Sequence, residues 1–165
     1  MSLTGSRLEQ LLTYAPETGL FYWKWREGTG AQLAGSIAGS IDKDGYRVIK
    51  LDQKIYRAHR LAWLWMTGSW PANEIDHADL NKDNNAFANL RDATKSQNMQ
   101  NMPCRPVSAT GVKGVQFDER RGRYYAKITA AGKKTWLGYH RNIEDAARAY
   151  ASAANELHGK FARVA

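Results

Sequence analysis

The stretch 75–101, IDHADLNKDNNAFANLRDATKSQNMQN, decides how the rest of the chain is interpreted. It joins Asp76 directly to His77 and contains five asparagines between 81 and 98. A carboxylate is a hard oxygen ligand suited to magnesium or manganese, and an imidazole with a pKa near ~6.5 suits a general base. Neighbours on a regular strand point to opposite faces, so the two groups are expected to have different tasks at a bend of the chain. We expect 94–101 to form a short helix that brings the amide oxygen of Asn98 towards Asp76.

This combination suits the hydrolysis of phosphodiesters, which needs a nucleophilic water and a cation that neutralises charge on the phosphate and the leaving oxygen. Taken singly, the same residues have ordinary explanations, because an Asp-His pair occurs in many turns and asparagines are common turn residues. Their joint spacing within the frame HRLAW…DH…NL…N, residues 59–98, favours a nuclease.

The frame resembles the His-Asn-Asn variety of HNH nucleases, which occurs in phages and in group I intron homing endonucleases. The resemblance implies a ββα-metal motif in which Asp76 and Asn98 bind one divalent cation, magnesium or manganese. It also implies that His77 activates the attacking water and that Asn89 orients His77. The phrases LLTYAPETGLFYW and GYRVIKLDQKIYRAHRLAW match what often precedes this motif in phage nucleases. No CxxC pair is present, so the zinc-stapled version is excluded.

The residues before the motif are expected to form a helix at 7–14, strands at 20–25, 46–51 and 54–58, and a helix at 59–66. We expect the Gly-, Ser- and Ala-rich stretch 26–45 to form loop and turn. Arg57 and Arg60 are candidate phosphate contacts, because a guanidinium matches a phosphate bidentately. His59 is interpreted as a packed residue, with a phosphate contact as the alternative.

Positive charge is concentrated in the last third of the chain. Residues 1–102 hold 12 basic and 11 acidic side chains, whereas residues 103–165 hold 12 basic and 5 acidic ones. This excess indicates a polyanionic partner, and nucleic acid is favoured over a merely solubilising surface. A membrane-surface role is disfavoured, because no basic amphipathic helix carries the charge.

The C-terminal part is expected to contain strands at 114–117, 123–129 and 134–139, followed by a helix at 142–157 with Asn142 as its N-cap. Alternation along 123–129 places cations, an aromatic ring and a hydroxyl on one exposed face. The other face is expected to pack against the alanine-rich helix. Tyr139, Tyr150 and Ala154 are assigned to the core. Such a sheet can lie in the major groove of DNA, where base edges carry a unique code.

Residues 108–162 resemble the plant ethylene-response-factor DNA-binding domain of the APETALA type, on phrases such as YAKI at 125–128, WLG at 136–138 and EDAARAY at 144–150. The residues that the resemblance assigns to the DNA-facing side are Gln116, Arg120, Arg121, Arg123, Tyr125, Lys127, Thr129, Lys134 and Trp136. Lys127 and Thr129 stand where a Glu and an Arg are usual, so the plant target sequence is not carried over.

The predicted fold class is α+β. N-terminal strands and a ββα-metal HNH motif are followed by a small domain in which a three-stranded antiparallel sheet packs on one helix. The predicted domains are an endonuclease domain at 1–102, a linker at 103–110 and a DNA-binding domain at 111–165. The single cysteine, the lack of an apolar run of ~18 residues and the lack of a signal at the N-terminus favour the cytoplasm of a bacterial or phage-infected cell, with no membrane partner.

The predicted function is that of a divalent-metal-dependent DNA endonuclease whose C-terminal domain binds double-stranded DNA. This prediction includes homing and nicking enzymes. The chain is expected to act as a monomer or a homodimer. The alternative is a non-catalytic, sequence-specific DNA-binding regulator with a degenerate nuclease segment. An RNA-binding module is a third, weaker interpretation.

Overall fold

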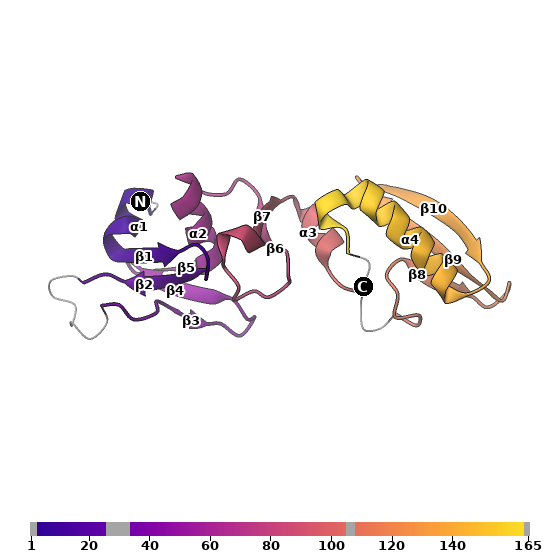
Figure 1. Cartoon of the computed structure of the whole chain (residues 1–165), viewed down its shortest axis with the longest axis horizontal. Coiled ribbons are helices and arrows are strands. Elements are labelled where there is room, and N and C mark those ends of the chain that lie inside the picture. Colours follow the sequence, from indigo (N-terminus) through magenta and orange to yellow (C-terminus); the bar gives the residue numbers. More distant parts are fainter. Residues whose placement is uncertain (1–2, 26–33, 105–107, 164–165) are drawn as a thin grey trace. The chain divides into compact units, whose positions relative to one another are not determined.

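The chain folds into two compact units, which comprise residues Met1–Ala93 and Thr94–Ala165 (Figure 1). The structure is a computed structural model that describes residues 3–25, 34–104 and 108–163. Helices and strands are mixed along both units, so the predicted α+β class is confirmed. The change of unit comes before the predicted linker 103–110, of which residues 105–107 lie outside the described residues.

The first unit begins with helix α1 (Gly5–Leu11), which is capped by the Thr4 hydroxyl accepting the Arg7 amide at 3.2 Å. The helix predicted at 7–14 is wrong at its end, because the chain turns at Leu12 into strand β1 (Leu12–Ala15). This strand forms an antiparallel hairpin with β2 (Leu20–Trp23). The apolar run fits both periods, and the strand prevails because it buries Leu12 and Tyr14 while exposing Thr13.

A second sheet contains the strands β3 (Ser40–Ile41), β4 (Arg47–Leu51) and β5 (Lys54–Arg57), all antiparallel. The predicted loop at 26–45 therefore contains a short strand, and its residues 26–33 lie outside the described part. Helix α2 (Ala58–Thr67) follows β5 directly and ends at Gly68, whose φ of 73° is left-handed.

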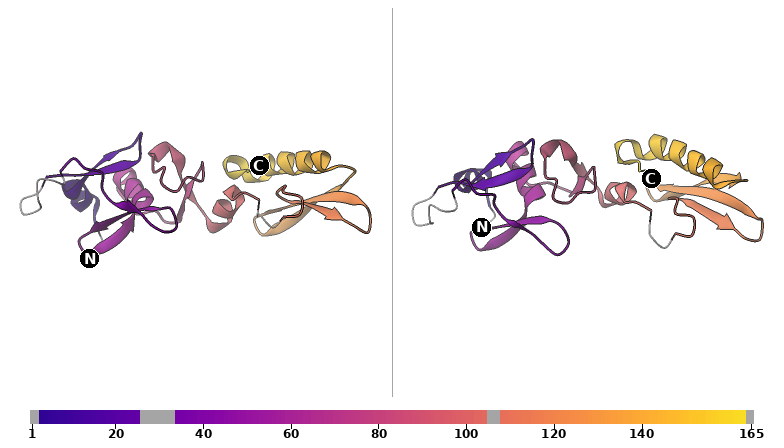
Figure 2. Two further views of the ribbon diagram at one scale, coloured as in Figure 1. Left: turned by 90° about the horizontal axis from the view of Figure 1, so that it is seen from below. Right: turned by 60° about the horizontal axis from the view of Figure 1, so that its bottom comes forward.

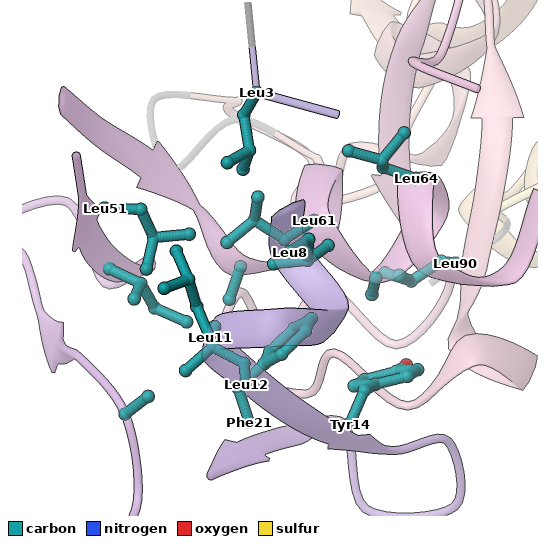
Figure 3. Packing of buried hydrophobic residues seen from close by; sticks show 14 of the residues in the cluster. Leu3, Leu8, Leu11, Leu12, Tyr14, Phe21, Leu51, Leu61, Leu64 and Leu90 are labelled. Carbon is teal, nitrogen blue, oxygen red and sulfur yellow. The ribbon is translucent and has the colours of Figure 1, made fainter. Parts of the chain in front are cut away.

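Leucines from α1, β1 and α2 surround Phe21 in the core of this unit (Figure 3). Leu8, Leu61 and Phe21 are completely buried, and the rings of Phe21 and Tyr14 stack with their centroids 4.6 Å apart. The core thus fixes the β1–β2 hairpin against α2, which matters for the site described below.

The remaining strands of the first unit, β6 (Glu74–His77) and β7 (Leu90–Ala93), pair antiparallel with Asp76 opposite Arg91. A long loop joins them and contains the 3-10 helix η2 (Phe87–Asn89). Helix α3 (Lys95–Asn101) follows in the second unit, and its capping box of Thr94 and Gln97 explains where it starts.

The rest of the second unit is a sheet in the order β10-β9-β8, covered on one face by helix α4 (Ile143–His158) (Figure 2). The strands are β8 (Val115–Asp118), β9 (Arg123–Ala130) and β10 (Lys133–His140). The side chains that form the core between helix and sheet are Val115, Ala126, Ile128, Ala146, Tyr150 and Ala154. The predicted strands and helix are confirmed, as is the Asn142 cap, whose side chain accepts the Asp145 amide at 2.8 Å. The 3-10 helix η3 (Gly159–Phe161) ends the described fold.

The assignment of Tyr139 to the core is wrong, since this side chain is 38% exposed. The pairing of β10 with β9 shifts between Trp136 and Tyr139, and Gly138 in this bulge has a φ of 100°. One extra residue reverses the alternation of faces, so Tyr139 joins Trp136 on the exposed side.

In the described ranges, no helix combines the length and the apolar character that crossing a bilayer requires.

Candidate active site

Asp76 and His77 are both buried, with exposed fractions of 3% and 5%, although they are neighbours on the short strand β6. Burial of two ionisable side chains costs free energy unless each finds partners. Their surroundings therefore determine what each can do.

The partner of Asp76 is Arg91, which lies directly across the strand pair. Its guanidinium donates from Nε to Asp76 Oδ2 at 3.0 Å, and its Nη2 contacts the same oxygen. The Arg91 side chain is itself only 15% exposed. The ion pair compensates the charge of this buried carboxylate, which is the type of group that binds a hard cation.

His77 is bonded through its ring Nε2 to Asn85 Oδ1 at 3.3 Å. Burial lowers the pKa of His77 from its ordinary value, and this outweighs the opposite effects of the Asn85 bond and of the Asp79 and Asp76 charges. The imidazole is therefore neutral at neutral pH and able to accept a proton.

Asn85 was not among the residues singled out from the sequence, yet it is completely buried at the centre of the loop. Its Nδ2 donates to the Asp83 carbonyl at 3.0 Å, and its own carbonyl accepts the Tyr14 hydroxyl at 2.7 Å. Gly19, with a φ of 75°, lies so close that an added Cβ would come within 2.1 Å of the Asn85 backbone. The β1–β2 hairpin thus holds Asn85 in place, and Asn85 in turn holds the ring of His77.

The side chain of Asn89, predicted to orient His77, bonds the loop after His77. Its Oδ1 accepts the Asp79 amide at 3.1 Å, and its Nδ2 donates to Asp79 Oδ1 at 2.9 Å and to the Asn84 carbonyl at 2.8 Å. The Asn89 carbonyl also accepts the amide of Ala78, the residue next to His77. These bonds hold the two ends of the loop together, and an effect of Asn89 on the imidazole stays a prediction.

Asn98, the second predicted metal ligand, lies on α3 in the C-terminal unit. Its approach to Asp76 stays a prediction. Within the described residues, no three His, Cys, Asp or Glu side chains gather in a way that could hold a metal. A carboxylate such as that of Asp76 is the type of ligand that magnesium takes, since magnesium is typically held by one or two carboxylates and keeps several waters.

His59 lies on α2 beside His77, with ring centroids 5.0 Å apart and planes at 90°. It is 5% exposed, and the predicted packed position is confirmed. Burial lowers the pKa of His59 to about 3, and electrostatic interactions with His77, Arg57 and Arg60 act in the same direction. The ring of Tyr46 completes the cluster, with centroids 5.4 Å from His59 and 6.1 Å from His77.

The two arginines predicted to contact phosphate differ in their surroundings. Arg57 is exposed, and its Cζ lies 4.1 Å from the centroid of the Tyr46 ring, next to the histidines. Arg60 lies over Trp70 instead, at 6.0 Å. Arg57 is thus the one that the structure places near His77.

The residues predicted to face DNA gather on the sheet of the second unit, opposite α4. The register pairs Gln116 with Tyr125, Lys127 with Trp136, and Thr129 with Lys134, and paired residues share a face. Arg123 is the first residue of β9 and has the same place in the alternation as Tyr125 and Lys127. Arg120 and Arg121 lie in the turn before it.

An aromatic group on this face was only partly anticipated. Tyr125 stacks on Trp136 at 5.2 Å, and Tyr139 meets Trp136 edge-on at 5.0 Å. The Tyr139 hydroxyl also accepts from Arg121 at 3.0 Å and donates to Asp118 at 3.0 Å, which holds Arg121 over the sheet. The sequence signal for this arrangement was the glycine that forms the bulge.

Comparisons with known proteins match the segment that contains Asp76 and His77. Residues 56–100 match the HNH endonuclease family. The chain is 34% identical over 111 residues to protein 3.8 of Escherichia phage T7, which corresponds to 67% of this chain and 91% of that protein. The chain belongs to the family of protein 3.8 and carries an HNH endonuclease domain. A solved structure, of DNA binding and cleavage by the HNH homing endonuclease I-HmuI, covers 90% of this chain and 85% of its own, with 22% identity and a TM-score of 0.46.

The ion pair of the HNH domain gives a first prediction. Arg91→Met is expected to lower the free energy of unfolding by about 3 kcal/mol in metal-free buffer, because a buried carboxylate loses its partner. Urea denaturation followed by tryptophan fluorescence measures this. Combining it with Asp76→Asn should cost less than the sum of the two single changes, and additive costs would contradict the coupling. The matched control is Arg7→Met, whose pair with Asp52 is 44% and 48% exposed, so its loss should change the unfolding free energy far less than the loss of Arg91.

The buried histidine of the HNH domain gives a second prediction. The pKa of His59 is about 3 in the folded protein and 6.5 ordinarily, so the unfolded chain binds more protons between these values. Stability is therefore complete above pH 6.5 and is lost as the pH falls towards 3, at up to about 1.4 kcal/mol per pH unit for this group. His59→Phe should flatten the slope of unfolding free energy against pH in that window. Equal slopes in parent and variant would show that His59 is not buried in its neutral form.

Proposed function

We propose that the protein is a divalent-metal-dependent DNA endonuclease in which His77 is the general base. The observation that carries this proposal is the pairing, on one strand of an HNH domain, of a buried ionised carboxylate with a buried neutral imidazole. If Asp76 and His77 only stabilised the fold, two ionisable side chains would not be needed in the interior, because burying either of them costs free energy.

The tautomer of His77 follows from its partner. The Asn85 side chain donates through Nδ2 to the Asp83 carbonyl, so its Oδ1 faces His77 and only accepts. The proton of the neutral ring is therefore on Nε2, and the lone pair is on Nδ1. In the proposed reaction, Nδ1 takes a proton from water as the water oxygen bonds to phosphorus, and the bond from phosphorus to the 3′-oxygen breaks. The leaving 3′-oxygen takes up a proton from solvent water. The products carry 5′-phosphate and 3′-hydroxyl ends.

Asp76 and Asn98 are the proposed ligands of one magnesium or manganese ion. When bound, such an ion supplies positive charge for the phosphate and the leaving oxygen. The Arg91 guanidinium on Oδ2 holds the Asp76 carboxylate in one orientation. Asn89 acts one step away, because its bonds to Asp79 and Asn84 keep the loop that carries Asn85 closed.

We propose that the exposed sheet face of the second unit binds double-stranded DNA. The residues proposed to contact it are Gln116, Arg120, Arg121, Arg123, Tyr125, Lys127, Thr129, Lys134, Trp136 and, in addition, Tyr139. Support comes from their common face and from the excess of basic residues in 103–165. Arg57 and Arg60 are proposed phosphate contacts in the first unit. A single site per chain cuts one strand, and cutting the other requires either a second copy or that the chain turns round on the DNA.

We propose that this activity takes place in the cytoplasm of a bacterial or phage-infected cell, which the similarity to a phage protein supports.

The third prediction tests cleavage. With supercoiled plasmid and magnesium or manganese, the parent should nick or linearise the DNA, and EDTA should stop it. His77→Ala and His77→Gln should cut at least about 100-fold more slowly, since general base catalysis contributes this much. The control is His140→Ala in the other unit, and thermal unfolding shows whether each variant is folded. Equal cutting by parent and His77 variants would remove His77 from the reaction, and no cutting by the parent with any metal would favour a DNA-binding regulator.

The fourth prediction tests the sheet face. Lys127→Gln is expected to weaken binding of a mixed-sequence duplex and to reduce the slope of log affinity against log salt by about 0.9, because one phosphate contact is lost. Trp136→Ala should weaken binding without changing this slope. Fluorescence anisotropy across a salt series measures both. Arg148→Gln removes the same charge from α4, on the other side of the sheet, and should leave the slope unchanged. A slope change as large in Arg148→Gln as in Lys127→Gln would exclude this face.

A further inference from the structure

The ring of Tyr46, next to the imidazole of His77, is approached by two cations. The Cζ atom of Arg57 lies 4.1 Å from the ring centroid and Lys82 Nζ lies 4.9 Å from it. The two cations are therefore no more than 9.0 Å apart, the sum of these distances. They come from separate elements, since Arg57 ends β5 and Lys82 lies in the loop after β6.

These two cations differ from the other basic side chains around the site. Arg91 is paired with Asp76, and Arg47 donates to Asp83 from Nε at 2.8 Å and from Nη2 at 3.0 Å. In the part of the chain that the structure describes, neither Arg57 nor Lys82 forms an ion pair with a carboxylate. Both are exposed, so a ligand that binds beside the Tyr46 ring can reach both charges.

Lys82 is held in place before any ligand arrives. Its Nζ donates to the Asp44 carbonyl at 2.8 Å, which draws the side chain across the turn between β3 and β4. The same turn is tightened by Asp42, whose Oδ1 accepts the amides of Asp44 and Tyr46, both at 2.9 Å. The backbone bonds, and further the charges of Arg57 and Lys82, lower the pKa of Asp42. Two cations thus act on this one carboxylate, which leaves an excess of positive charge.

We propose that Arg57 and Lys82, arranged about the Tyr46 ring, bind a phosphate of the DNA backbone beside His77, and that Lys82 is a substrate-positioning residue of the nuclease. This inference rests on the proposed function and adds Lys82 and Tyr46 to its residues. A guanidinium binds two phosphate oxygens at once, whereas an ammonium acts as a point charge. The phosphate is held between a planar donor and a charge, and the Tyr46 ring sets the orientation of both through cation–π contacts.

The location of the cluster indicates that it positions the DNA strand for the reaction as well as binding it. Tyr46 also packs against His59 and His77. A DNA strand bound by Arg57 and Lys82 is therefore held in a defined position relative to His77, the proposed general base. Small displacements of a reacting group are costly for catalysis, so this positioning is expected to appear in the rate as well as in binding.

The first measurement is made without metal, so that it does not depend on cleavage. Thymidine 3′,5′-bisphosphate is titrated into the full chain in EDTA while the ring resonances of Tyr46 and His77 are followed by NMR. In the parent these resonances should shift, and in Lys82→Gln the affinity should fall about tenfold, as expected for one charge-assisted bond. Lys82→Arg should keep most of the affinity. Lys50→Gln is the matched control, because it removes the same charge from an exposed position on β4.

The second measurement is plasmid cleavage with magnesium by the same variants. Lys82→Gln should cut about tenfold more slowly than Lys50→Gln at equal stability. If the parent cuts and Lys82→Gln behaves as Lys50→Gln in both measurements, the phosphate site is wrong and the proposed function stands. If the parent never cuts but the bisphosphate still shifts Tyr46 in a Lys82-dependent manner, the proposed function fails and the phosphate site stands. Absence of any shift in the parent would also overturn the site.

Discussion

The bond between His77 and Asn85 is the interaction on which the candidate site depends. A buried imidazole needs a partner that sets its tautomer, and Asn85 supplies an acceptor because its own amide is committed to Asp83. Asn85 is held in turn by the hydroxyl of Tyr14 and by the close approach of Gly19. The hydrophobic core of the first unit therefore acts on the chemistry through the β1–β2 hairpin.

Electrostatics gives the two adjacent residues of β6 different properties, an anionic oxygen ligand and a neutral base. Arg91 forms an ion pair with the Asp76 carboxylate, whereas burial lowers the pKa of His77 and keeps its imidazole neutral. The strand pairing that places Arg91 opposite Asp76 thus separates the behaviour of two groups that the backbone places side by side. Such a pair suits a reaction that needs a cation ligand and a proton acceptor at one phosphate.

The second unit is also built from strands and helices, but its candidate residues lie on an exposed sheet face. Its sheet is covered by α4 on one side, which leaves the other side for cations and aromatic rings. The bulge at Gly138 turns Tyr139 outward, and Tyr139 then holds Arg121 over the face. The exposed face is thus organised by contacts within the unit.

The sequence by itself determined the fold class, the strands of the second unit, the Asn142 cap and the Asp76-His77 pair, because these depend on local periodicity, capping and adjacent residues. Only the tertiary structure decided which of the five asparagines meets His77, since that choice depends on Tyr14, which lies 71 positions away from Asn85. It also decided that Leu12–Ala15 is a strand and that Tyr139 points outward, because hairpin pairing and a one-residue bulge override the local pattern. The pairing of Arg91 with Asp76 belongs to the same class, since strand register is set by partners that no local motif encodes.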